Sequence, residues 1–413
     1  MLRIGHTADW HLGAAGTRHH RNGLSAALMD RYECAKFAVN DAVERGAELI
    51  LVAGDVFNGW RPTPTEVRLA KRALEPATRA GIEVVMLKGN HDDVRTPTEE
   101  HALDLLRDTS GLCIVDHPKL LNVWRKRGGG LSAEPLMQSP ADGAELELQI
   151  ACLPWPNLSL LLRDEATRAL DPGQRNLRVR ELLMDVARGL ATERIKGVPA
   201  VLLGHFSVDV AAAGAQDRLM LLGGDWTLNL QEIEALGFDA VMLGHIHKGQ
   251  HLGSLAIWYS GSPEACSFSE EGEEKFYLLH TPTPDASRPG EWFNLATQRI
   301  STPYRRLVTL NAAEPLPEIP AGAIVRLQIP AAWDGNLREL HAALEQAGAT
   351  EVRVETQHAE THLRRETGVS EGMGHEDALK VWLAQRPELH PLTEAILRVA
   401  VEIEGELGEG RAM

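Results

Sequence analysis

The chain has 413 residues, with 42 Lys and Arg against 58 Asp and Glu, so its formal net charge is −16. This length is enough for two or three domains, and 44% hydrophobic with 24% charged residues excludes wholesale disorder and a fibrous repeat. The negative charge argues against a protein that coats nucleic acid by charge alone. Any contact with DNA would depend on local basic patches, bound metal ions or a partner.

The compartment can be predicted from features that the sequence lacks: a membrane span, a secretory leader and a disulfide framework. No stretch approaches 18 consecutive apolar residues, and Met1–Ile4 opens directly into a strand-like run, so we expect neither a membrane span nor a secretory leader. The four cysteines (Cys34, Cys113, Cys152 and Cys266) are too few and too scattered for a disulfide framework or a zinc knuckle. We therefore expect a reduced, cytoplasmic environment.

The first 280 residues alternate short apolar runs with amphipathic stretches. Strands are predicted at Leu2–Thr7, Leu49–Val52, Ile82–Leu87, Leu146–Leu153, Ala200–Leu203, Ala240–Leu243, Ile257–Ser260 and Phe276–His280. Helices are predicted at Leu24–Arg45, Thr65–Ala80, Thr98–Leu106, Leu177–Glu193 and Asn229–Ala235. This alternation is typical of an α/β domain, in which ligands bind in loops beyond the carboxyl ends of strands.

Two segments interrupt this pattern. Lys126–Gly143 is rich in Gly, Ser and Pro and predicts a surface hairpin or excursion. Thr281–Gly290 carries three prolines and predicts either a loop or a boundary.

The pattern changes after Pro303. Strands at Leu307–Leu310, Ile324–Ile329 and Glu351–Thr356 surround a helix at Leu337–Gln346, which is a βαβ-type unit too small to be stable unless it docks. From Gly374 only helices are predicted, at Glu376–Gln385 and Pro391–Leu407, and the tail of the last one, Glu402–Glu409, is acidic. We therefore expect three parts, with limits 1–300, 303–366 and 374–413.

The residues that carry chemistry lie in five short segments, each directly after a predicted strand. They are Asp9-Trp10-His11, Gly54-Asp55, Gly89-Asn90-His91-Asp92, Gly204-His205 and Gly244-His245-Ile246-His247. In four of the five, a glycine precedes the polar residue and allows the backbone to turn sharply and approach a ligand.

These residue types suit the hydrolysis of a phosphodiester. That reaction needs a hydroxide nucleophile at neutral pH and relief of charge on the phosphoryl oxygens, which two metal ions about 3.5–4 Å apart can supply. The candidate ligands in these segments include four imidazoles, two carboxylates and one amide. Because imidazole favours transition metals over Mg²⁺ and Ca²⁺, we expect Mn²⁺ first.

Each segment has a plainer interpretation when taken singly. Asp9 or Asp55 after a strand can be a turn or N-cap residue, Gly89-Asn90 can be a turn, and His205 can be a satisfied buried histidine. The joint occurrence of five segments, in one order and each at a strand end, favours the metal centre.

In this order, D-x-H, G-D, G-N-H-D, G-H and G-H-x-H resemble the calcineurin-like metallophosphoesterase superfamily over roughly residues 1–300. Ile4–Gly13, Ala53–Phe57 and Tyr259–Pro263 are similar to the SbcD family of bacterial nuclease subunits. The resemblance implies an α/β fold, a four-layer calcineurin-like sandwich of two mixed sheets flanked by helices. It also implies a small α/β capping domain and C-terminal helices that bind an ATPase partner.

The resemblance also implies two Mn²⁺ ions per chain and a ligand set. One ion would take Asp9, His11 and His247, the other Asn90, His205 and His245, with Asp55 bridging both. His91 would stabilise the transition state or protonate the leaving 3′ oxygen. Asp92 would orient that imidazole or serve only as a turn residue.

The sequence departs from the family at one position. Some relatives carry a second histidine three residues after the bridging aspartate, where this chain has Asn58. An amide cannot take up a proton, so either His91 acts alone or another group assists it.

Basic and aromatic residues follow the metal motifs. Arg18, Arg21, Arg61 and Arg95 would either hold the DNA backbone or be ordinary solvated charges. Trp10 and Trp60 would stack on unpaired bases or, as is more common for tryptophan, pack in the interior.

The C-terminal helices carry an apolar surface too large for a solvated tail. Leu379, Trp382, Leu383 and the Leu392–Ile403 stripe predict a segment that docks in a groove, or one that packs on its own domain. By resemblance the groove belongs to the coiled-coil root of the SbcC ATPase, and two nuclease subunits form a homodimer in the complex. The chain has no phosphate-binding loop of its own, so ATP would bind the partner.

The sequence therefore favours a Mn²⁺-dependent nuclease subunit that cuts DNA without a covalent intermediate. The resemblance implies double-strand exonuclease and single-strand or hairpin endonuclease activity in double-strand-break repair, recombination and replication. Two alternatives stay open, a small-molecule phosphoesterase and a non-catalytic scaffold of the same fold.

Overall fold

The structure is a computed structural model that describes residues 2–13, 20–21, 23–94, 100–135, 143–157, 170–211, 226–284, 292–356, 375–384, 393 and 396–398. The chain divides into two compact units. The first comprises Met1–Leu310, Leu316–Arg326 and Leu337–Arg353, and the second comprises Asn311–Pro315, Leu327–Asn336 and Val354–Met413. No helix in the described ranges is long and apolar enough to cross a bilayer.

Two large mixed sheets form the centre of the first unit. Among the described residues, one sheet has six strands, in the order β17 (Trp292–Ser301), β16 (Phe276–Pro284), β1 (Ile4–Thr7), β4 (Leu49–Val52), β5 (Glu83–Leu87) and β6 (Leu112–Val115). Strands β1, β4, β5 and β6 are parallel, so their carboxyl ends lie at the same edge of the sheet.

The second sheet has seven strands in the part of the chain that the structure describes. Their order is β14 (Gln250–Leu252), β15 (Ile257–Tyr259), β13 (Ala240–Gly244), β10 (Ala200–His205), β9 (Glu145–Leu153), β7 (Lys119–Arg125) and β8 (Leu131–Pro135). Strands β9, β10, β13 and β15 are parallel. A second set of carboxyl ends therefore gathers at one edge.

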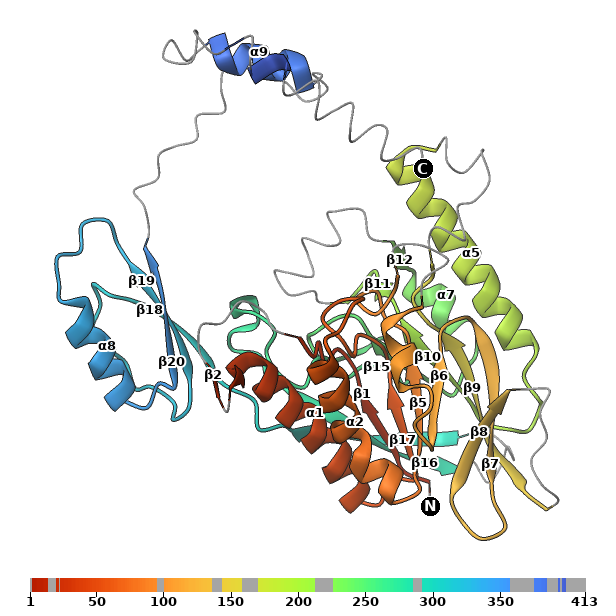
Figure 1. Cartoon of the computed structure of the whole chain (residues 1–413). Helices are drawn as coiled ribbons and strands as arrows, with labels where there is room; N and C mark the ends of the chain where they lie inside the picture. The colour runs from red at the N-terminus through yellow and green to blue at the C-terminus, as the bar shows by residue number, and fades with distance from the viewer. Residues whose placement is uncertain are drawn as a thin grey trace. The chain divides into compact units, whose positions relative to one another are not determined.

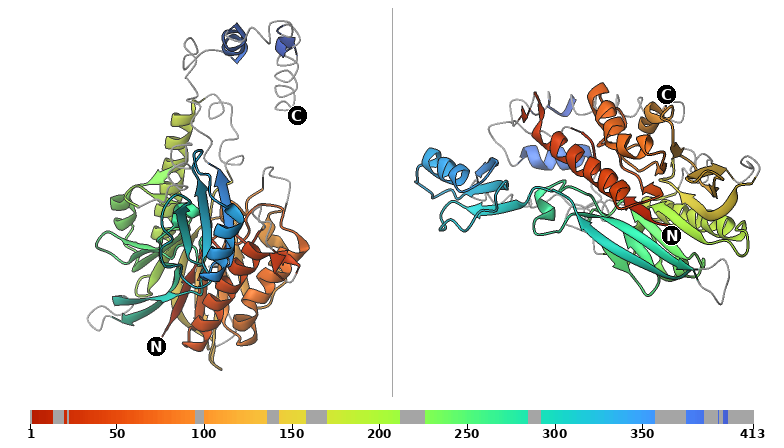
Figure 2. Two further views of the ribbon diagram at one scale, coloured as in Figure 1. Left: turned by 90° about the vertical axis from the view of Figure 1, so that its left-hand side faces the viewer. Right: turned by 90° about the horizontal axis from the view of Figure 1, so that it is seen from below.

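The two sheets pack face to face. Ile4, Leu51 and Val85 of the first sheet share one buried cluster with Leu203 and Met242 of the second. Helices α1 (Ala26–Glu44) and α2 (Pro64–Arg79) cover the outer face of the first sheet, and α5 (Pro172–Thr192) and α7 (Leu230–Glu234) cover that of the second (Figures 1 and 2). The predicted four-layer arrangement, two mixed sheets flanked by helices, is confirmed.

Helix α2 begins where the loop after β4 ends, because its first residues form an N-terminal capping box. The Thr63 hydroxyl accepts the backbone N–H of Glu66, whose carboxylate accepts the N–H of Thr63 at 2.6 Å. Pro64 occupies the first helical position, where its missing N–H is harmless. The capping box thus fixes the end of the loop that carries Asp55.

The remaining elements are shorter. They are β2 (His20–Arg21), β3 (Leu24–Ser25), β11 (Ser207–Val208), β12 (Thr227–Leu228) and the 3₁₀ helices η1 (Ala102–Leu106) and η2 (Phe268–Glu270). A three-stranded sheet has the order β18 (Leu307–Asn311), β19 (Ile324–Ile329) and β20 (Glu351–Thr356), with α8 (Leu337–Gln346) between β19 and β20 in sequence. Helix α9 spans His375–Ala384 and buries Leu383.

Strand β16 corrects one prediction. The loop or boundary predicted from Thr281 is wrong as far as Pro284, because β16 continues to Pro284 in register with β17. Among the described residues, its other neighbour, β1, pairs with Leu278–His280. The pairing described beyond His280 is on one side, as at an edge, where prolines are tolerated.

Other predicted elements differ less from the structure. The described part of the Gly-rich excursion is a hairpin in which β8 pairs antiparallel with β7. The helix predicted at Thr98–Leu106 is a 3₁₀ helix that begins at Ala102. Strands β6, β7, β14 and β17 were not predicted. The Leu392–Ile403 stripe, its acidic tail, Arg18 and Arg95 lie outside the described residues, apart from 393 and 396–398.

Candidate metal centre

The five predicted segments meet between the carboxyl ends of the parallel strands of both sheets. Backbone bonds join the first two segments, because the N–H of Asp9 donates to Gly54 O at 3.0 Å and that of His11 to Asp55 O at 3.0 Å. The N–H of His245 donates to both carboxylate oxygens of Asp9, at 3.0 and 3.1 Å. Segments from the two sheets are thereby held against each other.

Backbone strain is concentrated in these segments. Within the described ranges, the non-glycine residues with positive φ are Asp9 (54°), His11 (45°), Asp55 (53°) and His245 (91°), and all four are predicted ligands. Such conformations cost roughly 1–3 kcal/mol each and persist where the surrounding structure determines them. This concentration of strain is typical of a functional site.

One cluster of potential metal-ligand atoms surrounds the amide of Asn90. His205 Nε2 lies 3.0 Å and His245 Nδ1 lies 2.9 Å from Asn90 Oδ1. His205 Nδ1 lies 2.6 Å from the Ala53 carbonyl oxygen, which directs Nε2 toward Asn90 and toward Asp55 Oδ2 at 3.3 Å. The residues of this cluster, together with Asp55, come from the ends of four different strands.

A second cluster lies on the other side of Asp55. His11 Nε2 is 3.0 Å from His247 Nε2 and 3.7 Å from the same Asp55 Oδ2. One carboxylate oxygen therefore faces an imidazole of each cluster. This is the position that a carboxylate shared by two cations would occupy.

Two glycines allow this close approach. A Cβ atom on Gly89 would lie 2.1 Å from Asp55 Oδ1, and one on Gly54 would lie 2.3 Å from His205 Nδ1. Gly54 also has a φ of +94°, which side chains rarely adopt. Neither position tolerates a larger residue while Asp55 and His205 stay in place.

The electrostatics of the site favour cations. Burial would raise the pKa of Asp55, but His205 and His91 lower it well below its usual range. Burial would lower the pKa of His205, whereas Asp55 raises it to about 9. Burial lowers the pKa of His11 well below its usual value. Four imidazoles, two carboxylates and an amide, converging in the interior, fit divalent transition metals.

A buried ion pair supports His247, and sequence reasoning missed it. Glu270 Oε1 lies 3.0 Å from His247 Nδ1, and Lys275 Nζ lies 2.5 Å from Glu270 Oε2. Burial would raise the pKa of Glu270, but His247 and Lys275 lower it to about 2. The carboxylate holds the proton on Nδ1, so that Nε2 can act as a ligand.

Two further side chains were missed. The buried Arg31 donates to the carbonyl oxygen of His11 at 2.9 Å. The ring of Trp155 lies 5.2 Å from that of His245 and 6.3 Å from that of His205. Both residues lie far in sequence from the motifs, and no spacing rule links them to the ligands.

The two predicted catalytic residues, His91 and Asp92, have different surroundings in the structure. The His91 ring lies edge-on to that of His11 at 4.6 Å, and its Nδ1 lies 3.3 Å from the carbonyl oxygen of Asn58. Asp92 is fully buried and accepts backbone N–H groups of Val56 (3.3 Å), Phe57 (3.0 Å) and Gly89 (3.0 Å). The hydrogen bonds described for Asp92 therefore match the second predicted role, that of a turn residue that binds backbone N–H groups.

The residues considered for DNA contact differ in exposure. Trp10 is only 1% exposed and donates to the Thr7 hydroxyl at 3.0 Å, so it packs in the core rather than stacking on a base. Trp60 is half-buried, and the guanidinium of Arg61 lies 3.9 Å from its ring centre. Arg21 pairs with Asp30.

The family model described as calcineurin-like phosphoesterase matches residues 2–249, and the chain belongs to this family. The resemblance to the SbcD family is confirmed by its relatives. The chain is 28% identical to a Rhodobacter capsulatus protein over 368 residues (84% of each chain) and 26% identical to a Bacillus subtilis protein over 357 residues (82% of each), both named as the D subunit of the nuclease SbcCD. A dimetal phosphatase structure from Danio rerio aligns with 73% of this chain and 96% of its own, with 10% identity and a TM-score of 0.37, which is a weak likeness.

Proposed function

We propose that this chain is the nuclease subunit of a DNA-repair complex of the SbcCD type and hydrolyses phosphodiester bonds at a pair of Mn²⁺ ions. The observation that carries the proposal is the position of Asp55 Oδ2, 3.3 Å from His205 on one side and 3.7 Å from His11 on the other. The similarity to SbcD-family nucleases over most of the chain supports DNA as the substrate.

The ligand set divides in two around Asp55. Asp9, His11 and His247 would hold one ion, Asn90, His205 and His245 the other, and Asp55 both. When bound, the ions would supply a hydroxide nucleophile and relieve charge on the phosphoryl oxygens. Glu270 fixes the tautomer of His247, and Arg31 fixes the backbone of His11.

His91 would act on the leaving group. Its ring is half-buried beside His11, so it can reach both the metal position and solvent. An imidazole there can donate a proton to the departing 3′ oxygen near neutral pH. Asp92 contributes by holding the loops after β4 and β5 together, since its carboxylate bonds to the backbone of both.

The remaining parts would serve DNA and the partner. The predicted capping domain, residues 303–366, would contact DNA, and the segment from 374 to 413 would dock on the coiled-coil root of an SbcC-type ATPase. Two nuclease subunits would assemble in the complex. Double-strand exonuclease and hairpin endonuclease activities are the reactions proposed for it.

The deciding experiment compares two substrates in the presence of Mn²⁺. The chain should cleave a hairpin oligonucleotide far faster than a chromogenic phosphodiester of low molecular weight, and Asp55→Asn should abolish the cleavage. Asp108→Asn, which changes an exposed carboxylate, is the matched control and should cleave normally. Preference for the small diester would support a small-molecule phosphoesterase, and no cleavage of either would support a scaffold.

A further inference from the structure

A cysteine lies beside one half of the proposed metal centre, and no family motif in the sequence includes it. The ligand atoms of Cys266, His11 and His247 all lie within 4.8 Å of one another. We propose that Cys266 supplies a thiolate to the His11–His247 metal position and shifts its preference from Mn²⁺ toward softer divalent ions such as Zn²⁺ and Co²⁺. The inference rests on the proposed function, because it assigns a further ligand to that site.

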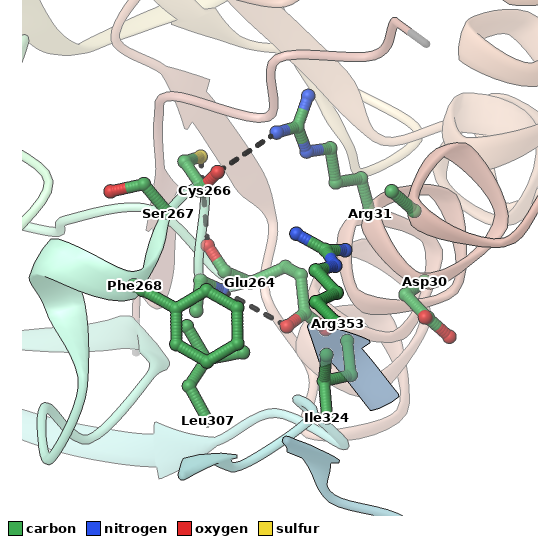
Figure 3. Close-up of a pocket in the computed structure, with 11 residues that line it drawn as sticks. Asp30, Arg31, Glu264, Cys266, Ser267, Phe268, Leu307, Ile324 and Arg353 are labelled. Atoms are coloured by element: carbon green, nitrogen blue, oxygen red, sulfur yellow. Dashed lines mark hydrogen bonds between the residues drawn. The ribbon is translucent and has the colours of Figure 1, made fainter. Parts of the chain in front are cut away.

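The side chains that hold the two histidines also hold Cys266. Glu270, which bonds to His247 Nδ1, accepts the backbone N–H of Cys266 at 3.2 Å. Arg31, which donates to the carbonyl oxygen of His11, also donates to that of Cys266 at 3.3 Å (Figure 3). Cys266 is therefore fixed on both sides by the framework that positions His11 and His247.

The sulfur lies beside one of the proposed ligands. The hydrogen bond described for Sγ is a long contact of 3.8 Å to the Glu264 carbonyl oxygen. The Cys266 side chain also interacts with the imidazole of His247, with which it would share a cation.

The distances suit one ion. Zinc binds thiolate at about 2.3 Å and imidazole at about 2.0 Å, so two such ligand atoms of one tetrahedral ion lie about 3.5 Å apart. The three ligand atoms all lie within 4.8 Å of one another, so side-chain movements of about 1 Å bring them to that separation. On binding, an S–metal bond replaces the S–H bond and the thiol proton passes to solvent.

The chemical consequence is metal selectivity. Thiolate is a soft ligand that favours zinc over the harder Mn²⁺, and the Irving–Williams order already ranks Zn²⁺ and Co²⁺ above Mn²⁺ for nitrogen and sulfur donors. A site in which a thiolate joins two imidazoles and the carboxylates of Asp9 and Asp55 would therefore retain Zn²⁺ or Co²⁺ more strongly than the same site without the thiolate.

Absorption spectroscopy of the full chain loaded with Co²⁺ tests the proposal. Visible d–d bands report cobalt at the centre, whereas a near-ultraviolet sulfur-to-cobalt charge-transfer band reports a thiolate ligand. The wild type should show both, and Cys266→Ser should keep the d–d bands and lose the charge-transfer band. Cys113→Ser, a half-buried cysteine outside the cluster, is the matched control and should keep both.

The possible outcomes separate this inference from the proposed function. Visible bands without charge transfer in the wild type would overturn the thiolate ligand and leave the metal centre intact. Absence of any cobalt bands would overturn the metal centre itself. In a competition between Zn²⁺ and Mn²⁺, Cys266→Ser should lose about tenfold of the wild-type preference for Zn²⁺, and an unchanged ratio would refute the selectivity.

Discussion

Substitution of Asp92 tests whether this carboxylate holds the loops or takes part in the chemistry. The side chain accepts backbone N–H groups of Val56 and Phe57 from the loop after β4 and of Gly89 from the loop after β5, all in a fully buried position. Asp92→Asn removes the charge and turns an amide N–H₂ toward at least one of these donors. The two loops that carry Asp55 and Asn90 should then separate.

The expected magnitude follows from the hydrogen bonds. A buried hydrogen bond to a charged group contributes roughly 1.5–3 kcal/mol. The amide replaces either Oδ1, which accepts one of the three N–H groups, or Oδ2, which accepts two, so the loss costs about 1.5–6 kcal/mol. Unfolding entropy of about 2.1 cal/mol/K per residue gives about 0.6 kcal/mol/K for a unit of about 300 residues. The melting temperature of Asp92→Asn should therefore fall by about 2–10 °C, together with Mn²⁺ affinity.

Differential scanning calorimetry and a Mn²⁺ titration measure both effects. Asp108→Asn is the matched control, because Asp108 is exposed and makes none of the three loop bonds. Its melting temperature should fall by no more than about 2 °C. If Asp92→Asn melted as the wild type and bound Mn²⁺ normally while cleavage disappeared, the positioning role would be refuted in favour of a catalytic one.

Two other substitutions and one truncation extend the account. His91→Ala should keep its bound metal, measured by elemental analysis, while hairpin cleavage falls by about 10²–10⁴-fold; loss of metal as well would contradict the assigned role. Truncation before Gly374 should keep Mn²⁺-dependent cleavage and abolish co-purification with an SbcC-type ATPase, and unchanged capture would refute the docking segment. Burial raises the pKa of Glu264 from 4.5 to about 7, so ionisation destabilises the folded state as pH rises through this range, by at most about 3 kcal/mol. Glu264→Gln should therefore melt above the wild type at pH 8 and near it at pH 5, unlike the exposed control Glu33→Gln; equal differences at both pH values would disprove this.

The ligands could be predicted from the sequence because their placement follows from topology. In parallel strands a polar residue just beyond an apolar run lies at the same edge as its counterparts, so Asp9, Asp55 and Asn90 are brought together by one sheet alone. His205 and His245 follow in the same way from the second sheet. The family motifs then supplied the division of these residues between two ions.

The supporting residues could not be predicted, because tertiary packing places them. Glu270 lies in a 3₁₀ helix 23 positions beyond His247, and Arg31 lies inside α1, where the sequence shows only an amphipathic pattern. The tail of β16 contains two prolines and is typical of a loop until its one-sided pairing is known. Local pattern therefore indicates which side chains converge, and packing decides what holds them.

The spin coupling between bound ions tests the central claim most directly. Low-temperature electron paramagnetic resonance of the Mn²⁺-loaded chain should show an exchange-coupled multiline spectrum with two ions per chain, because Asp55 Oδ2 lies between both donor clusters. Asp55→Ala should lose that coupling. A spectrum of isolated, uncoupled Mn²⁺ in the wild type at saturation would contradict a shared carboxylate and the hydrolytic site built on it.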